Sequence, residues 1–263
     1  MPYTIVDGER IFYTYHYNVD RQDPHLLLVH GAGGNHLHWG HAIRNLKNAH
    51  VYALDLPGHG RSDGTGRTSI ADYADFLAGF MDALGLIKAV VAGHSMGGAT
   101  ALMMALRHPQ RVAGLVLVGT GARLRVLPAI LEGTLHDFAH TIHLICEYAY
   151  SPNAPKELVQ QGQRQMLRVA PQILHSDFVA CNAFDVMGRL DEIHCPTLVI
   201  CGNEDKLTPP KYSSFLVEHI AGAERKLIEG AGHMVVTEKP DEVATAIASA
   251  LAKWQSSGYT ALR

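Results

Sequence analysis

Segment 89–100 constrains the fold of this chain more than any other, because it joins a short apolar run to a helical pattern through the sequence Gly-His-Ser-Met-Gly. Its first four residues, Ala-Val-Val-Ala, fit a strand buried on both faces, and residues 97–107 fit a helix packed behind that strand. So sharp a turn strains the backbone of its central residue, Ser95, and requires side chains to be missing at Gly93 and Gly97. The segment therefore predicts a serine hydroxyl lifted clear of a sheet at the amino end of a helix, whose free N–H groups can bind an oxyanion.

The composition limits the class of protein and of partner. A chain of 263 residues with 47% hydrophobic residues is long enough for one large α/β domain with a sizeable core. Its net charge of -3, from 22 Lys and Arg against 25 Asp and Glu, gives neither the basic field that nucleic acid requires nor a strongly acidic one. We therefore expect a small, roughly neutral partner and no binding of nucleic acid.

Cysteine usage and the start of the chain indicate the compartment. The 4 cysteines show neither metal-type pairing nor a dense disulfide framework, so we expect buried free thiols in a reducing compartment. No basic segment precedes an apolar one at the start, and no apolar run approaches ~20 residues, so secretion and membrane insertion lack support. The 17 histidines lack paired carboxylates at ligand spacing. We expect a cytoplasmic protein without metal or other cofactor.

Strand and helix patterns alternate along most of the chain. An alternating hairpin over 3–6 and 11–17 opens it, and a helix over 70–84 has an apolar face and Ser69 as its N-cap. This alternation predicts an α/β fold with a mostly parallel sheet flanked by helices. The remaining predicted elements are buried strands at 25–30, 50–56, 114–119, 196–202 and 224–229 and a helix at 240–253.

The alternation stops between about residues 123 and 190, where three helical segments follow one another, each with a proline near its start. We predict an inserted helical cap at 123–190 between two parts of one core, 1–122 and 191–263. Apolar residues from Leu131 to Ile145 recur at the spacing of a single helix, and we assign Phe138 and Ile142 of this stripe to substrate binding. The alternative is that the stripe only packs the cap on the core.

Two loops near the predicted site contain glycine and histidine. The loop after strand 25–30 reads Gly-Ala-Gly-Gly, and its backbone can approach a ligand closely, so Ala32 is our candidate for an oxyanion N–H donor. The alternative is a plain exit from the strand. The turn after strand 50–56 contains Asp55 and His59, which we interpret as holding that turn by local hydrogen bonds rather than as catalytic.

The ends of two later strands supply an acid and a base. Asp205 follows strand 196–202, with Glu204 as the alternative acid, in the crevice where α/β sheets bind ligands. His233 follows strand 224–229 after the short loop Gly-Ala-Gly. A lone loop histidine is usually just solvated, but this one stands where a base is required.

These residues together predict nucleophilic catalysis. A serine hydroxyl is a poor nucleophile near neutral pH, so it needs an imidazole to take its proton and a carboxylate to orient that imidazole. Ser95, His233 and Asp205 supply this set, and each ends a predicted strand. The N–H groups of Met96 and Ala32 would hold the oxyanion.

The chain resembles the α/β-hydrolase superfamily over nearly its whole length, in particular compact members with a helical cap that are similar to bacterial esterases and lactonases. The resemblance implies the α/β-hydrolase fold and a serine hydrolase. Related dehalogenases and epoxide hydrolases have aspartate at the position of Ser95, which argues against both activities. The motifs that carry the resemblance are His30-Gly31-Ala32, residues 55–62 (DLPGHGRS), residues 93–97, Asp205 in Gly-Asn-Glu-Asp and His233 in Gly-His.

The function that follows is hydrolysis of a small to medium, uncharged carboxylic ester through an acyl-enzyme, with a small-molecule ester as partner. The same triad serves lactone opening and carbon–carbon bond hydrolysis, so both stay open as alternatives. A non-catalytic binding protein or receptor on this fold is the alternative of another class, and the intact triad argues against it. The oligomeric state stays open.

Overall fold

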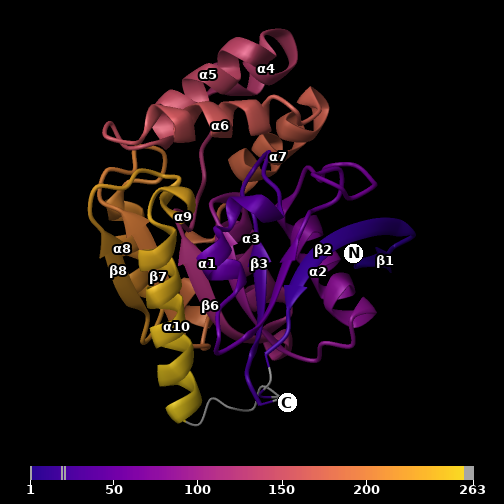
Figure 1. Cartoon of the computed structure of the whole chain (residues 1–263), viewed down its shortest axis with the longest axis vertical. Helices are drawn as coiled ribbons and strands as arrows, with labels where there is room; N and C mark the ends of the chain where they lie inside the picture. The colour runs from indigo at the N-terminus through magenta and orange to yellow at the C-terminus, as the bar shows by residue number, and fades with distance from the viewer. Residues whose placement is uncertain (1, 19, 21, 258–263) are drawn as a thin grey trace.

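The computed structural model describes residues 2–18, 20 and 22–257, and these form an eight-stranded sheet flanked by helices (Figure 1). The strand order is β1-β2-β4-β3-β5-β6-β7-β8. Strands β1 (Tyr3–Val6) and β2 (Glu9–His16) form the predicted antiparallel hairpin, β2 pairs antiparallel with β4, and the pairs from β4 through β8 are parallel. The predicted mostly parallel sheet is confirmed.

The remaining strands lie where the sequence predicts them, with small shifts at their ends, and β8 at the edge of the sheet is largely exposed. The second strand of the parallel set ends at Leu54 rather than 56, and Leu56 already belongs to the following turn, where its carbonyl accepts from His59 N over 2.9 Å. The bounds are β3 His25–Val29, β4 His50–Leu54, β5 Ala89–His94, β6 Val112–Val118, β7 Thr197–Gly202 and β8 Glu224–Ile228.

Alternate residues of each strand pack into two separate apolar clusters, one on each face of the sheet. In β5, for example, Val91 joins the first cluster, whereas Val90 and Ala92 join the second, as the two-residue period of a strand requires. The first face is covered by α2 (Ile70–Ala83), α3 (Met96–Arg107) and α8 (Pro210–His219). The second is covered by α1 (His41–Arg44), α9 (Val235–Glu238) and α10 (Pro240–Ser256). Short 3-10 turns lie at His36–His38, Pro109–Arg111 and Met187–Glu192.

Four helices between β6 and β7 lie together at one end of the molecule, over the sheet (Figure 1). We call them the cap helices: α4 (Pro128–His136), α5 (Phe138–Ala149), α6 (Lys156–Met166) and α7 (Pro171–Ala183). The two ends of this insertion meet in an isolated antiparallel bridge between Arg123 and Asp185. The insertion therefore leaves and rejoins the core at one place.

The expectation of one helix carrying the stripe from Leu131 to Ile145 is wrong. Asp137 leaves the helical conformation, at φ -146° and ψ 64°, and its N–H closes α4 by donating to Gly133 O over 2.9 Å. Gly133 also lets α5 approach closely, since a Cβ there would lie 2.2 Å from Thr141 Oγ1. A glycine and an aspartate thus fold the predicted single helix into two.

The cysteines are free thiols, and Cys146, Cys181 and Cys201 are buried. Burial raises the pKa of Cys146 to about 11 and that of Cys201 to about 12, so these thiols stay protonated at neutral pH. They are packing groups rather than nucleophiles. No helix in the described part of the chain is long and apolar enough to cross a bilayer.

Candidate active site

Ser95 stands at the turn between β5 and α3 in the strained conformation that the sequence predicts. Its backbone has φ 55° and ψ -115°, a left-handed φ that is rare outside glycine. A Cβ on Gly93 would lie 2.0 Å from Gly97 O, and a Cβ on Gly97 would lie 2.2 Å from Val29 O. Both glycines are therefore required by the close approach of three backbone segments.

Hydrogen bonds from the neighbouring strand fix the backbone of Ser95. Its N–H donates to Val118 O over 2.9 Å, and its carbonyl accepts from the Thr120 hydroxyl over 2.8 Å. The same carbonyl accepts from Ala99 N in the first turn of α3. These bonds offset the unfavourable φ and leave the side chain to face the cavity described below.

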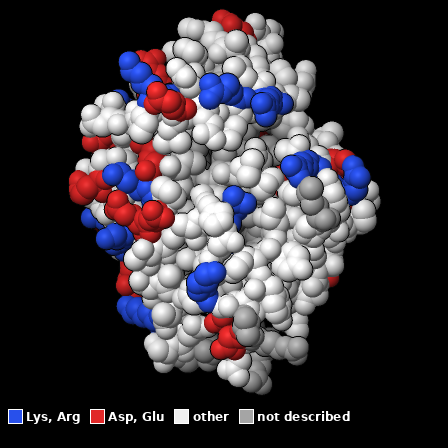
Figure 2. All heavy atoms as spheres, in the orientation of Figure 1, with Lys and Arg blue, Asp and Glu red and all other residues white. Residues whose placement is uncertain are grey.

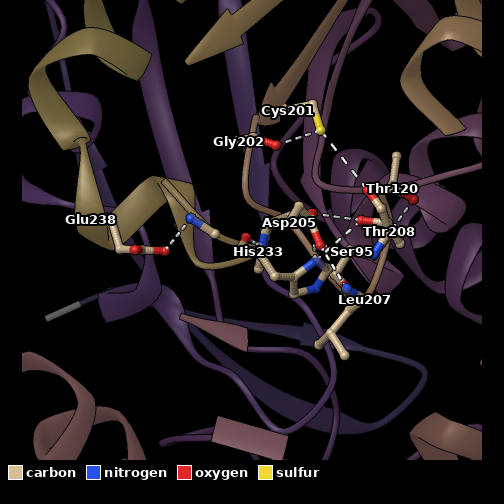
Figure 3. A network of polar contacts seen from close by, with 11 residues as sticks. Ser95, Thr120, Cys201, Gly202, Asp205, Leu207, Thr208, His233 and Glu238 are labelled. Carbon is tan, nitrogen blue, oxygen red and sulfur yellow. Dashed lines mark hydrogen bonds and ion pairs between the residues drawn. The ribbon is translucent and has the colours of Figure 1, made fainter. Parts of the chain in front are cut away.

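His233 lines the same cavity as Ser95, and Asp205 is hydrogen-bonded to His233 (Figure 3). His233 Nδ1 lies 3.0 Å from Asp205 Oδ2, and Thr208 Oγ1 donates to the same carboxylate oxygen over 2.8 Å. The other oxygen accepts from the N–H groups of Leu207 and Thr208, over 2.9 and 2.8 Å. Of the two acids considered from the sequence, Asp205 is the one that contacts His233.

The surroundings of Asp205 keep its carboxylate ionised. Burial by itself raises the pKa of Asp205, but the charge of His233 and the hydrogen bonds from His233 and Thr208 outweigh it, and the net pKa lies below the ordinary value. With Asp205 as acceptor, the proton on the His233 ring is drawn to Nδ1. Nε2 is then free to accept a proton.

The loop that carries His233 is held from both sides. Glu238 accepts from the N–H of Gly232 over 3.0 Å and from the N–H of Ser151, just after cap helix α5, over 2.9 Å. Met234 N also donates to Ala149 O, 3.0 Å away. The end of α5 and the His233 loop are therefore one hydrogen-bonded unit.

The glycine loop after β3 lies beside Ser95. Gly31 and Ala32 line the same cavity as Ser95, and Met96 is the first residue of α3, whose N–H has no acceptor within the helix. His30 fixes the base of this loop, because its Nδ1 donates to Gly31 O over 2.8 Å and its Nε2 accepts from Leu56 N over 3.0 Å. Ala32 therefore lines the cavity beside Ser95, and Met96 follows Ser95 directly; their N–H groups stay our candidates for an oxyanion hole.

Sequence reasoning missed one buried residue of the cap, Asp177 on α7. Its carboxylate accepts from Gly33 N in the glycine loop over 2.8 Å and from the Tyr73 hydroxyl of α2 over 2.5 Å. His59 Nε2 lies 2.8 Å from the same carboxylate, so the turn after β4 is joined to the cap. Asp55, by contrast, accepts from Arg61 N within that turn, as expected. A lone aspartate on a cap helix carries no sequence pattern that would signal these contacts.

The cavity at Ser95 is small and mostly apolar. Its volume is about 70 Å3, well below the ~300 Å3 at which pockets for drug-sized ligands begin. No lysine or arginine is among the described residues that line it. The lining side chains are Ile145, Ala149, Met166 and Phe178 from the cap and Ala32, His38, His94, Ser95, Leu207, His233 and Met234 from the core, with Gly31.

Phe138 and Ile142, which we expected to contact substrate, are not among these lining residues. Ile142 is fully buried in a cluster of cap residues that also includes Met234 of the core, and Phe138 packs against that cluster. Ile145 and Ala149 of the same helix line the cavity instead. The cap contributes to the cavity, but through the last turns of α5 rather than the first.

Two further histidines of the cavity wall are uncharged at neutral pH. Burial lowers the pKa of His38 to about 4 and that of His94 to about 3. His94 Nε2 lies 2.9 Å from His233 O, which places it behind the His233 ring. Neither imidazole adds a positive charge for an anionic substrate. No group of three or more potential metal ligands occurs in the described part of the chain.

Comparison with known proteins places this site in a family. A model of the α/β hydrolase family matches residues 26–246. The chain belongs to the α/β hydrolase family. The chain is similar to a thermophilic esterase of known structure, with 36% identity over 96% of this chain and 97% of that one and a TM-score of 0.84. It is also similar to an N-acyl homoserine lactone degrading enzyme of known structure, with 28% identity over 94% of this chain and 99% of that one and a TM-score of 0.82. A third similar protein is the 2-hydroxy-6-oxo-6-phenylhexa-2,4-dienoate hydrolase of Comamonas testosteroni, with 29% identity over 86% of this chain and 87% of that one.

The close approach at the turn of this hydrolase predicts the effect of a single methyl group. Gly93→Ala should lower the free energy of unfolding by at least about 3 kcal/mol, because the new Cβ meets backbone that cannot move independently. The matched control is Gly188→Ala, where a Cβ meets nothing within 4 Å and the change should stay within about 1 kcal/mol. Urea unfolding measures both, and equal effects would contradict the steric account.

The depressed pKa of Asp205 predicts a pH-dependent contribution to stability. Its folded pKa lies below the ordinary 3.8, so the contribution is complete above that value and is lost as pH falls toward the folded pKa. The difference in unfolding free energy between the native protein and Asp205→Asn should therefore shrink from about pH 5 to about pH 3. A difference that stays constant over this range would show that the ionisation of Asp205 does not stabilise the fold.

Proposed function

We propose that this protein is a serine hydrolase that cleaves small to medium, uncharged carboxylic esters through an acyl-enzyme. One observation carries the proposal: the strained Ser95 lines one cavity with His233, and His233 is hydrogen-bonded to Asp205. This is the arrangement that activates a serine hydroxyl. The similarity to a thermophilic esterase supports the same conclusion.

In the first half of the reaction, His233 Nε2 accepts the proton of Ser95 while Oγ attacks the ester carbonyl. The imidazolium that forms is stabilised by Asp205 through Nδ1–H. The carbonyl oxygen becomes an oxyanion held by the N–H groups of Met96 and Ala32. His233 then returns the proton to the alkoxide, and the alcohol leaves the acyl-enzyme.

In the second half, water takes the place of the alcohol. His233 accepts a proton from this water, the resulting hydroxide adds to the acyl carbon, and the same N–H groups hold the second oxyanion. Collapse of this intermediate breaks the bond to Oγ, which recovers its proton from His233. The products are a carboxylic acid and the regenerated serine.

The shape and charge of the cavity support a short, uncharged acyl group. A volume of about 70 Å3 leaves room for only a small group without movement of the cap. The walls offer no cation to an anionic substrate. On the outer face shown in Figure 2, acidic and basic side chains are interspersed along one side, without a broad patch of one sign.

Similar proteins point to a second candidate, the opening of a lactone, which is a cyclic ester and needs no further catalytic group. The likeness to an N-acyl homoserine lactone degrading enzyme favours it. Carbon–carbon bond hydrolysis of a dienoate-type substrate fits less well, because its carboxylate would enter a cavity without lysine or arginine in its described lining. A panel of aryl esters, lactones and such dienoates separates the three.

Removal of the nucleophile tests the proposal directly. Ser95→Ala should lower ester turnover by a factor of about 10⁴ or more, because the attacking atom is lost, while the protein still folds. A fluorophosphonate should label the native protein at Ser95, which mass spectrometry of the digested adduct identifies. Labelling at another residue, or turnover in Ser95→Ala close to that of the native protein, would exclude this mechanism.

The cavity lining predicts how acyl preference changes. Each buried methylene gains ~0.8 kcal/mol until the wall is reached, so p-nitrophenyl esters should show an optimum at short acyl chains. Ile145→Ala removes part of the wall and should move the optimum to longer chains. Ile142→Ala on the same helix is the matched control: it should cost about 2–4 kcal/mol of stability and leave the optimum unchanged. A shifted optimum in Ile142→Ala alone would contradict this assignment.

A further inference from the structure

We propose that Asp177 is a positioning residue for the oxyanion hole, and that it acts as an ion pair with a doubly protonated His59. The proposal rests on the proposed function, because it assigns Asp177 to the oxyanion hole of that reaction. Asp177 belongs to the cap, whereas the loop that it holds belongs to the core. The cap would thereby set the geometry of the chemical step as well as enclosing the substrate.

The contacts of Asp177 form a closed and fully buried set. The residue has 0% exposure, and three donors from three core segments converge on its carboxylate: Gly33 N, His59 Nε2 and the Tyr73 hydroxyl, at 2.8, 2.8 and 2.5 Å. Gly33 is bonded directly to Ala32, the proposed oxyanion donor. The Asp177 carboxylate therefore holds the Ala32–Gly33 peptide unit, which adjoins the unit that carries the Ala32 N–H.

The cap reaches the glycine loop through packing as well as through this hydrogen bond. Gly33 has φ 62°, and a Cβ there would lie 2.8 Å from Leu174 Cδ1. Leu174 and Asp177 are three residues apart on α7 and so lie on one face of that helix. One face of α7 thus holds Gly33 by an apolar contact and by a charged hydrogen bond.

The hydrogen bonds of His59 determine its protonation. Its Nδ1 lies 3.0 Å from the carbonyl oxygen of Pro57, and its Nε2 lies 2.8 Å from Asp177 Oδ2. Both partners are acceptors, so both ring nitrogens must donate, and only the imidazolium carries two N–H groups. Burial by itself lowers the pKa of His59, but the charge of Asp177 and its hydrogen bond raise the net pKa above the ordinary value.

The positive charge of His59 is what makes Asp177 compatible with catalysis. An unpaired carboxylate bonded to Gly33 N would repel the negative charge that develops at the neighbouring oxyanion. The imidazolium cancels this repulsion and leaves the hydrogen bond intact. The other histidines near His59 do not compete for the charge, because burial lowers the pKa of His30 and of His38. Asp55, the remaining nearby carboxylate, accepts from His36.

Two substitutions separate the hydrogen bond from the charge. Asp177→Ala removes the acceptor, and kcat for a short aryl ester should fall about 10- to 100-fold with KM changed less than about threefold, because a misplaced oxyanion donor weakens only transition-state binding. Asp177→Asn keeps an acceptor but loses the charge, and it should recover part of kcat. An alkyl boronic acid forms a tetrahedral adduct with serine, and its affinity should fall more in Asp177→Ala than in Asp177→Asn.

Amide hydrogen exchange over residues 31–34 supplies a readout that does not depend on any substrate. Exchange in this loop should speed up in both Asp177 variants. The matched control is Asn182→Ala on the same helix, whose side chain accepts from Val126 N over 3.1 Å and does not bond to the loop. This control should lose stability but keep native kcat and native loop exchange.

These measurements distinguish a positioning role of Asp177 from a purely structural one. If the Asp177 variants match Asn182→Ala in kcat and in loop exchange, Asp177 is only a packing and stability residue and the proposal is overturned. Should Asp177→Ala fail to fold, Asp177→Asn is judged on the same measurements, with a fall in kcat of about threefold or more at unchanged KM expected. If the native protein hydrolyses no ester, the proposed function fails. Loop exchange and the rate of fluorophosphonate labelling at Ser95 then still test whether Asp177 positions the loop.

Discussion

The close approach of three backbone segments around Ser95 is the constraint on which the rest of the site depends. Gly97 lies so near Val29 O that no side chain fits between them, which brings the start of α3 against the end of β3. The nucleophile and the glycine loop are therefore neighbours because their strands are neighbours. The sheet therefore brings together the two backbone segments that we propose as an oxyanion hole, independently of their side chains.

Much of this arrangement could be predicted because it depends on local pattern. Apolar runs of strand length define the sheet, and glycine spacing defines the turn at Ser95. Carboxyl ends of parallel strands meet at one edge, so residues that leave different strands, such as Asp205 and His233, come together without any signal linking them in the sequence. The strand ends themselves shift by a residue or two where a turn begins.

The cap could not be predicted to the same depth, for two physical reasons. Helical periodicity identifies an apolar face but not its partner, so it cannot tell Ile142, which is fully buried in an apolar cluster, from Ile145, which lines the cavity. The break at Asp137 accompanies a close contact of two helices at Gly133, and such a contact between helices leaves no mark in helical periodicity. The contacts of Asp177 likewise join segments more than a hundred residues apart.

The bridge between Arg123 and Asp185 has a consequence for how such a protein diversifies. Because the insertion leaves and rejoins the core at one place, it is a module that recombination can exchange without reordering the sheet. Such an exchange has two requirements: the new insertion must supply a hydrogen-bond acceptor for the Gly33 amide and a donor for Glu238. Substitutions at wall residues such as Ile145 and Met166 face no such requirement. Point mutation in the wall is therefore the open route to new substrates, whereas replacement of the whole module is a restricted one.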